Sequence, residues 1–292
     1  MPCVSIYLPT RNRADRLVEA IRSVQQQDHA DFELLVVDDA SSDTTPERVA
    51  ALMRADARIK YLRLATPHGA ARARNAAIRV AQGAWITGID DDDLMLPAHV
   101  SGLLAAYRDE DALVCAGFYQ ERDGWRRPIV HRAEHIALDA LLHYNWVGSQ
   151  ALMATERVRA VGGFDEHFVA CQDWDLWTRL VARFGPARRS RAVSYVSRED
   201  VSTGRITGSA QAAIGTAQYA HKHAVCLTNA HRRSHQLLAR IAAKESLSLW
   251  SLATHIVGGQ RSLALRYALG RVPPLRWLSL WWRRHRYPAA SG

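Results

Sequence analysis

The sequence predicts an α/β protein in which a mostly parallel central sheet is flanked by helices and followed by a helical, basic C-terminal extension. Short apolar runs alternate with helical patterns over the first 120 residues, polar clusters follow several of these runs, and only helical patterns continue beyond residue 208. With 292 residues, 48% of them hydrophobic, the chain can bury a large core. We expect one domain over residues 1–207 and the extension over residues 208–292.

The first half of the chain alternates predicted strands with predicted helices. Five apolar runs are typical of strands, at residues 4–9, 32–39, 59–64, 84–90 and 112–118. Four helical patterns accompany them, at residues 13–27, 44–56, 69–83 and 97–109. Thr44 or Thr45 is a candidate N-cap for the second helix, and Pro46 suits its first turn. The hydrophobicity of residues 34–37 is continuous, which indicates a parallel sheet covered on both faces.

The pattern is less regular from residue 125 to residue 200. Candidate strands lie at residues 124–132, 148–155 and 191–196. Helical patterns lie at residues 139–146 and 173–185, and the second has an apolar stripe that begins at Trp174. We find no internal repeat and no low-complexity linker.

Charge is distributed unevenly along the chain. Residues 210–292 contain 12 Lys and Arg against the single acidic residue Glu245, a net charge of +11, whereas the remainder sums to −2. Such an asymmetry points to an anionic partner for the C-terminal segment. The four cysteines are far apart in the sequence, which favours reduced thiols in a cytosolic protein over a disulfide framework or a zinc knuckle. Neither a secretory signal nor an apolar run long enough to span a membrane is expected.

Polar clusters follow three of the predicted strands. They are PTRNR at residues 9–13, DDASSD at residues 38–43 and DDDD at residues 90–93. In a parallel sheet the carboxyl ends of the strands share one edge, where ligands bind. Carboxylates there can hold Mg²⁺ or Mn²⁺ together with substrate phosphates. The alternative for residues 90–93 is a solvated acidic loop before a helix.

Several segments, in this order, resemble the inverting GT-A glycosyltransferases of family two. They are VSIYLPTRNR, SVQQQDHADFELLVVDDASSDTT, GAARARNAAIRVAQGAWITGIDDDDLMLP, GGFDE and QDWDLWTRL, within residues 3–200. The resemblance implies a GT-A fold, a nucleotide-sugar donor and a divalent metal, Mn²⁺ or Mg²⁺. It also implies an acceptor hydroxyl on a saccharide or lipid-linked glycan.

The resemblance also implies roles for individual residues of the donor site. Asp39 matches the position that reads the nucleotide base, with Asp38 beside it. The residues Pro9, Thr10 and Arg11 belong to the loop beneath the base. The residues Asp90, Asp91 and Asp92 match the DXD region, with Asp92 and Asp90 as metal ligands and Asp91 near the ribose. The arginines Arg72 and Arg74 lie in the segment that faces the nucleotide. The alternatives are a solvated helix face for the arginines and a loop-fixing hydrogen bond for Asp38.

Asp173 matches the catalytic base of the family. It would take the proton of the acceptor hydroxyl during a single inverting displacement. Gln172 replaces the usual glutamate and so removes a negative charge beside Asp173. The Asp173 pKa should therefore be lower than it would be next to a glutamate. The alternative role is an N-cap of the following helix. Trp174 and Trp177 are expected to pack in the core rather than stack on the acceptor.

The sequence departs from the family pattern in two further places. Arg11 stands where relatives often have a tyrosine that stacks on uracil, so a UDP-sugar is favoured while guanine and thymine donors stay open. No histidine follows the last predicted core strand, where some relatives use one. His131, His143 and His167 are isolated in sequence and are expected to be surface or core residues. A dinucleotide-binding oxidoreductase is disfavoured because no GxGxxG follows the first strand.

The C-terminal segment PPLRWLSLWWRRHRY combines tryptophans with arginines. It predicts either an interfacial helix on an anionic membrane or a segment that packs on the core or on a second subunit of a homodimer. No nucleic-acid partner is expected. We therefore predict a cytoplasmic, metal-dependent, inverting glycosyltransferase of cell-surface polysaccharide or glycan synthesis, peripheral at the inner face of the membrane. The alternative is a nucleotide-sugar-binding protein that transfers nothing and uses its tail as a scaffold.

Overall fold

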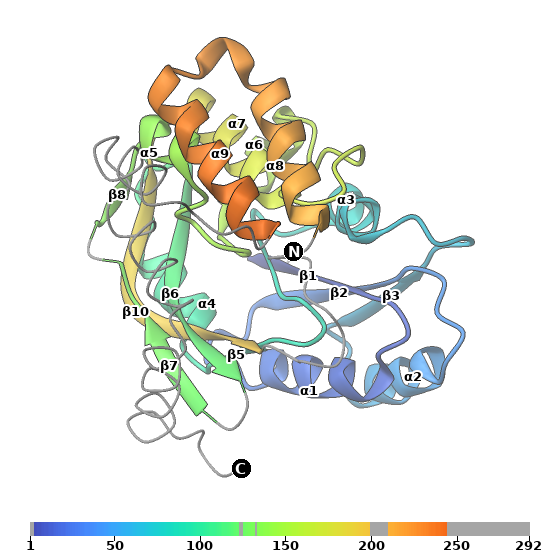
Figure 1. The fold of residues 1–292 in the computed structure, drawn as a ribbon. Helices are drawn as coiled ribbons and strands as arrows, with labels where there is room; N and C mark the ends of the chain where they lie inside the picture. The colour runs from blue at the N-terminus through green and yellow to red at the C-terminus, as the bar shows by residue number, and fades with distance from the viewer. Residues whose placement is uncertain (1–2, 123–124, 132, 199–209, 244–292) are drawn as a thin grey trace.

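A computed structural model describes residues 3–122, 125–131, 133–198 and 210–243. Its first sheet has the strand order β3-β2-β1-β4-β9, parallel except for β9 at one edge. Figure 1 shows β1, β2 and β3 side by side. The strands are β1 Val4–Thr10, β2 Phe32–Asp38, β3 Ile59–Arg63, β4 Trp85–Gly88 and β9 Met153–Ala154. Because β1 lies at the centre, its carboxyl end meets those of β2 and β4 at one edge, as the sequence predicts.

A second sheet has the order β5-β10-β6-β7. Its long strands β6 and β10 run parallel, and β5 and β7 are antiparallel to their neighbours. The short β8 also pairs with β10. The strands are β5 Leu94–Met95, β6 Leu113–Arg122, β7 Trp125–Ile129, β8 His135–Ile136 and β10 Ala187–Arg198.

Helices cover both faces of the first sheet. On one face, Ile6 and Leu8 of β1 pack with buried side chains of α1, α2 and α4. On the other, Tyr7 packs with buried side chains of α3, α6 and α7. These helices are α1 Ala14–Gln25, α2 Thr45–Ala55, α3 Ala70–Val80, α4 His99–Ala106, α6 Thr155–Ala160 and α7 Gln172–Phe184. Every residue of β1 and β2 is buried, which confirms a sheet covered on both faces.

The helices α8 Ala210–Lys222 and α9 Asn229–Ala242 pack on α7 and on α5 Leu138–His143 (Figure 1). A short 3-10 turn, Ala224–Cys226, lies between α8 and α9. The rings of Trp174 and Tyr219 stack with centroids 3.9 Å apart. His235 hydrogen-bonds the carbonyl oxygen of Leu142 at 2.8 Å. This part of the predicted extension therefore shares a core with α5 and α7, while the domain boundary near residue 207 stays a prediction.

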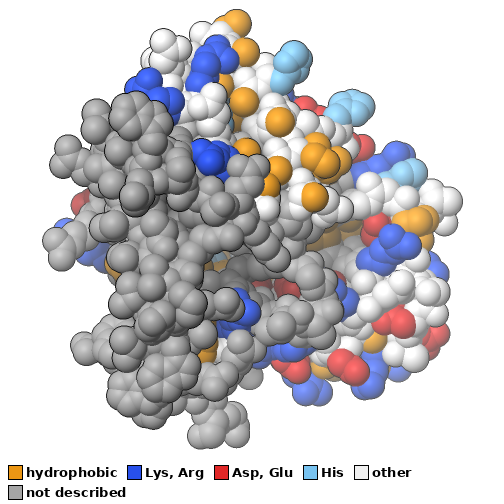
Figure 2. All heavy atoms as spheres, viewed as in Figure 1, with side chains coloured by type: hydrophobic (Ala, Val, Ile, Leu, Met, Phe, Trp, Pro, Cys, Tyr) orange, Lys and Arg blue, Asp and Glu red, His pale blue; other side chains and the backbone are white. Residues whose placement is uncertain are grey.

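The outer side of α8 is partly apolar. Figure 2 shows hydrophobic side chains gathered on the face over this helix, which contributes Ile214 with 52% of its surface exposed. No helix in the described part of the chain is long and apolar enough to cross a membrane. The Trp- and Arg-rich segment predicted to dock on a membrane lies outside the described residues.

The predicted strands and helices of the first half are confirmed, with ends that differ by a few residues. Two details differ. The Asp43 carboxylate, rather than a side chain of Thr44, accepts a hydrogen bond from the backbone N–H of Thr45 at the start of α2. The predicted strand at residues 148–155 is reduced to β9, because the chain turns at Gly148, whose φ is +100°, and Gln150 is held by other side chains.

Candidate active site

The acidic run, Asp90–Asp93, follows β4 at the carboxyl edge of the first sheet. Asp93 is buried and anchors the run to β10, since its carboxylate accepts hydrogen bonds from the Tyr195 hydroxyl at 2.8 Å and the Arg198 backbone N–H at 2.9 Å. Burial, with the charges of Asp90 and Asp92, raises the Asp93 pKa well above its usual value. Asp93 therefore has a structural partner on β10, whereas the carboxylates of its three neighbours face groups at the end of β1 and on α3.

Asp91 and Asp92 face the segment that follows β1. Thr10 donates its hydroxyl to Asp91 at 2.8 Å, and the Arg13 guanidinium donates to Asp91 at 3.0 Å and to Asp92 at 2.8 Å. Burial raises the Asp91 pKa to about 6, although Arg13 opposes the change. The Asp92 pKa is also raised, first by burial and then by the charge of Asp90. These carboxylates are crowded, and nearby positive charge favours their ionised form.

Asp90 faces α3 and the loop before β9. Its carboxylate accepts hydrogen bonds from Arg74 at 2.8 Å and from the Gln150 amide at 3.1 Å. The Tyr7 hydroxyl, from the centre of β1, donates to the same Gln150 side chain at 3.0 Å. Gly88 makes room for this ring, since a Cβ there would lie 1.9 Å from Tyr7. Asp90 is therefore positioned by a chain of hydrogen bonds that runs from the Tyr7 hydroxyl in the core through Gln150.

Asp173 lies in the first turn of α7, two residues after the N-cap Cys171, which adopts a left-handed conformation with φ of 65°. Its half-buried carboxylate accepts a hydrogen bond from the Asn145 amide at 2.9 Å. Burial raises the Asp173 pKa to about 6, the Trp174 backbone N–H and the Arg74 charge oppose this, and the Asp90 charge adds to it. Asp173 therefore lies close enough to Asp90, after β4, and to Arg74, on α3, for their charges to change its pKa.

The two aspartates at the carboxyl end of β2 hold loops in place. Asp38 accepts hydrogen bonds from the Ser41 backbone N–H at 2.7 Å and from the Tyr61 hydroxyl at 2.5 Å. Asp39 accepts one backbone N–H on each oxygen, from His68 and Gly69, both at 2.7 Å. The loop-fixing alternative considered for Asp38 therefore has a geometric basis, and Asp39 is engaged in the same way before α3.

The structure brings most of the predicted site residues to one edge but leaves two arginines outside. Thr10 and Arg74 contact the acidic run, and Pro9 is the adjoining buried residue of β1. Arg11 is exposed, and so is Arg72, whose guanidinium lies 3.4 Å from the His68 ring nitrogen. The exposed-face alternative for the arginines fits Arg72 but not Arg74, whose side chain is 14% exposed.

Four residues with direct contacts to the site have no predicted role in the sequence. Arg13 lies in the same polar cluster as Thr10, so the pairing of a basic cluster with an acidic one was a usable signal. Tyr7 is a polar residue within an apolar strand, which is a weaker signal. Asn145 and Gln150 lie where the sequence pattern is least regular, so only tertiary contacts identify them.

Backbone strain gathers around the site. Among the described residues, three non-glycine residues have positive φ: Asn12 at 53°, Ala40 at 58° and Cys171 at 65°. They follow β1, follow β2 and precede Asp173, respectively. Such conformations cost free energy and persist where the surrounding structure fixes them, as often happens at functional sites.

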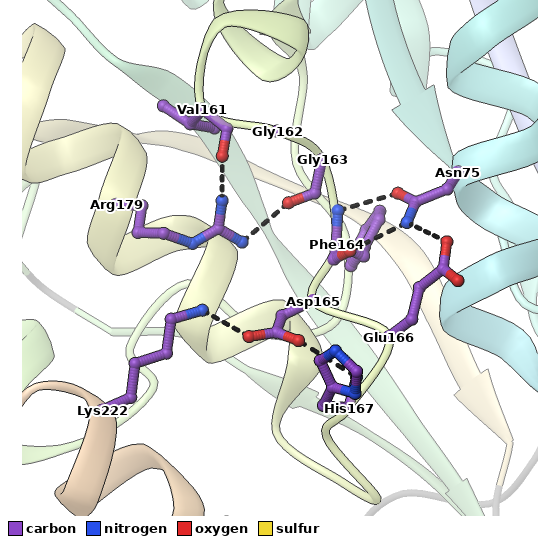
Figure 3. A pocket seen from close by; sticks show the side chains of 10 residues that line it. All are labelled: Asn75, Val161, Gly162, Gly163, Phe164, Asp165, Glu166, His167, Arg179 and Lys222. Atoms are coloured by element: carbon purple, nitrogen blue, oxygen red, sulfur yellow. Dashed lines mark hydrogen bonds and ion pairs between the residues drawn. The ribbon is translucent and has the colours of Figure 1, made fainter.

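A hollow of about 440 Å³ lies between α3, the GGFDE segment, α7 and α8 (Figure 3). Asn75 clamps the segment, with its amide donating to the Phe164 carbonyl and its oxygen accepting from the Phe164 N–H, both at 2.8 Å. Lys222 pairs with Asp165 at 2.7 Å across the hollow (Figure 3). The GGFDE segment therefore connects α3, which carries Arg74, with the helices that pack around Asp173.

Sequence comparison assigns the chain to a family. The model of glycosyl transferase family 2 matches residues 5–169, more than half of the chain. The chain belongs to glycosyl transferase family 2. Among similar proteins of this family, the putative colanic acid biosynthesis glycosyl transferase WcaA of Escherichia coli is 31% identical over 234 residues, which are 76% of this chain and 81% of WcaA. A Campylobacter jejuni relative, GalNAc(5)-diNAcBac-PP-undecaprenol beta-1,3-glucosyltransferase, is 38% identical over 125 residues, 42% of this chain and 40% of that protein.

Two solved glycosyltransferase structures share this fold. Residues 1–349 of TarS from S. aureus, in complex with UDP-GlcNAc, superpose with a TM-score of 0.60 at 17% identity, covering 87% of this chain and 72% of that TarS fragment. The mannosyltransferase PcManGT from Pyrobaculum calidifontis, in complex with GDP-Man and Mn²⁺, gives 0.62 at 21% identity, covering 96% and 83%. The predicted GT-A fold and the predicted family are therefore confirmed.

Proposed function

We propose that this family 2 enzyme transfers a sugar with inversion from a nucleotide-sugar donor to a hydroxyl of a saccharide or lipid-linked glycan. The observation that carries the proposal is the arrangement of three charged groups: Arg74 donates to Asp90 at 2.8 Å, and Asp173, held by Asn145 at 2.9 Å, lies close enough for both charges to act on its pKa. A carboxylate with a raised pKa beside a cluster of acids and an arginine is the combination expected of a general base next to a site for a charged substrate.

The donor is proposed to be a UDP-sugar. TarS is described in complex with UDP-GlcNAc, whereas PcManGT is described with GDP-Man, so the fold accepts more than one nucleotide. Arg11, exposed beside the end of β1, can stack its guanidinium plane on a base or reach a phosphate. Thr10 and Asp91 are hydrogen-bonded to each other at the same edge, where the ribose is proposed to lie.

We propose that a divalent ion, Mn²⁺ or Mg²⁺, binds at the residues that follow β4. Their carboxylates supply the oxygen ligands that hard cations prefer. Burial and mutual repulsion raise the pKa of Asp91 and Asp92, so a bound cation would relieve an unfavourable charge cluster. We propose Asp92 and Asp90 as ligands, and the ion would neutralise the charge that grows on the departing diphosphate.

The chain's own residues supply the remaining chemistry. Asp173 accepts the proton of the acceptor hydroxyl as that oxygen attacks the anomeric carbon on the face opposite the diphosphate. Asn145 orients this carboxylate through its amide hydrogen bond. Arg74 keeps part of the Asp173 population ionised and neutralises Asp90. A single displacement with one base gives inversion of configuration.

The acceptor and the cellular place are proposed from relatives and from the sequence. WcaA is named for colanic acid biosynthesis, and the Campylobacter relative is named for an undecaprenol-linked glycan. We propose cell-surface polysaccharide or glycan synthesis at the inner face of the cytoplasmic membrane, with the basic C-terminal segment contacting anionic lipid. A homodimer stays a prediction.

A direct experiment tests the proposal. The full chain is incubated with UDP-sugars and GDP-sugars, with Mn²⁺, Mg²⁺ or EDTA, and both nucleotide release and thermal shift are measured. We expect one donor to raise the melting temperature in the presence of a divalent ion and to be hydrolysed or transferred. A donor that stabilises the chain without any release of nucleotide would instead support the non-catalytic binding protein.

A further inference from the structure

A second group of side chains that can bind a metal ion lies between α5 and α9, away from the acidic run. Asp139 and His143 are one turn apart on α5, and His231 comes from the first turn of α9. One ligand atom of each residue lies within 4.8 Å of the others. The Asp139 oxygen and the His231 Nε2 are 3.1 Å apart, and the two histidine rings have centroids 4.2 Å apart.

The hydrogen bonds around His143 leave one of its ring nitrogens available. Its Nδ1 lies 2.7 Å from the Ser234 hydroxyl oxygen, and that hydroxyl can donate its proton to the Ala230 carbonyl at 3.2 Å. Either atom can donate in the 2.7 Å contact. In the tautomer in which Nδ1 donates to the hydroxyl oxygen, Nε2 carries a lone pair that can bind a metal ion. A hydrogen bond from the far ring nitrogen is the usual way in which proteins orient a histidine ligand.

His231 has a comparable support from the residue before its helix. Its Nδ1 lies 3.1 Å from both the backbone N–H and the hydroxyl of Thr228. The backbone contact uses Nδ1 as acceptor and places the ring proton on Nε2, toward Asp139. Shifting the proton to Nδ1, with the Thr228 hydroxyl as its acceptor, frees Nε2. The displaced backbone N–H belongs to an exposed residue and can bind water.

We propose that Asp139, His143 and His231 form a binding site for a transition-metal ion of the Zn²⁺, Co²⁺ or Ni²⁺ class. Two imidazole nitrogens and one carboxylate suit these ions, whereas Mg²⁺ and Mn²⁺ prefer oxygen ligands. Ligands of a tetrahedral zinc ion are about 3.3 Å apart, given zinc–nitrogen distances near 2 Å. The 3.1 Å contact already has this spacing, and Asp139, 81% exposed, is free to adjust its rotamer.

Such a site would hold α9 against the part of the chain that supports Asp173. The loop after α5 carries Asn145, two residues beyond His143, and Asn145 donates to the Asp173 carboxylate. The ion would join α5 to α9 without contributing to the donor site. The proposal is independent of the transfer reaction, since binding is measured without a sugar substrate.

Cobalt absorption provides the test. Full-length protein without an affinity tag is treated with EDTA, dialysed and titrated with Co²⁺, and the visible bands of nitrogen-ligated cobalt are recorded. We expect saturation at one ion with these bands, and displacement by Zn²⁺ but not by an equal concentration of Mg²⁺. The variants His143→Ala and Asp139→Asn should weaken binding at least about tenfold.

Two controls make the result specific. His221→Ala removes an exposed histidine of α8 and should leave the cobalt spectrum unchanged. Asp92→Asn, which removes a proposed ligand of the donor-site ion, should leave the nitrogen-ligated cobalt bands unchanged even if oxygen-ligated cobalt is lost. Circular dichroism checks that each variant folds. Absence of nitrogen-ligated cobalt bands in the wild type, or equal affinity of wild type and His143→Ala, would overturn the proposal while leaving the transfer reaction untouched.

Discussion

Replacing Asp173 with asparagine changes a single functional group at nearly constant volume. The Asn145 amide can still donate to the new side-chain oxygen, so the local hydrogen bond is retained. A general base contributes about 10² to 10⁴ in rate, and we expect kcat to fall by that factor while donor binding persists. The same change should stabilise the fold, because burial makes the ionised Asp173 unfavourable.

The size of this stabilisation follows from the pKa. Burial raises the Asp173 pKa from 3.8 to about 6, and a difference of about 2 corresponds to about 3 kcal/mol. Solvent contact of the half-buried carboxylate reduces the expected gain to about 1–2 kcal/mol. Because the folded pKa is raised, ionisation destabilises the native state progressively as pH rises from about 4 to about 6. The asparagine variant should therefore exceed the wild type in stability at pH 8 and match it at pH 4.

Urea unfolding of both proteins at pH 4 and pH 8, with sugar transfer at pH 8, measures both consequences. A purely structural Asp173, for example a helix cap, predicts the opposite sign, namely a less stable variant at pH 8. An asparagine variant that is less stable at pH 8, or that keeps near wild-type kcat, would refute the assignment. For the wild type, kcat/KM should fall below about pH 6 as the base becomes protonated.

Three further perturbations test the surroundings of the site. Arg13→Gln should lower the free energy of unfolding at pH 8 by about 1 kcal/mol, because Asp91 and Asp92 lose their cation. Added Mn²⁺ should restore the melting temperature of the variant. Equal effects of Mn²⁺ on wild type and variant would contradict this. Asn145→Ala should reduce kcat about tenfold through loss of one hydrogen bond to Asp173, with the donor-induced thermal shift retained; unchanged kcat would remove the orienting role. Gly163→Ala should cost about 2 kcal/mol in urea unfolding, since its φ is +70° and a Cβ would lie 2.5 Å from Asn75 Oδ1; a neutral effect would show that the loop relaxes.

The sequence was most informative about secondary structure, because the succession of apolar and polar residues follows the local backbone geometry. The apolar runs at β1, β2 and β4 and the polar clusters after them predicted a parallel sheet and the edge that carries the site. The proposed role of Asp173 as the base comes from the resemblance of its motif to the family rather than from residue spacing. His143 was expected to be an isolated histidine, because its partner His231 is 88 residues away along the chain and is reached only through the packing of α9 on α5.

The sequence by itself determined the alternation of strands and helices, the family and the identity of the acidic run, because hydrophobic periodicity and motif order are local properties. Only the tertiary structure decided which charges meet: Arg13 with Asp91 and Asp92, Arg74 with Asp90, and Asn145 with Asp173. These pairs join elements far apart in sequence, and the pKa of each carboxylate depends on burial and on neighbours that local patterns do not encode.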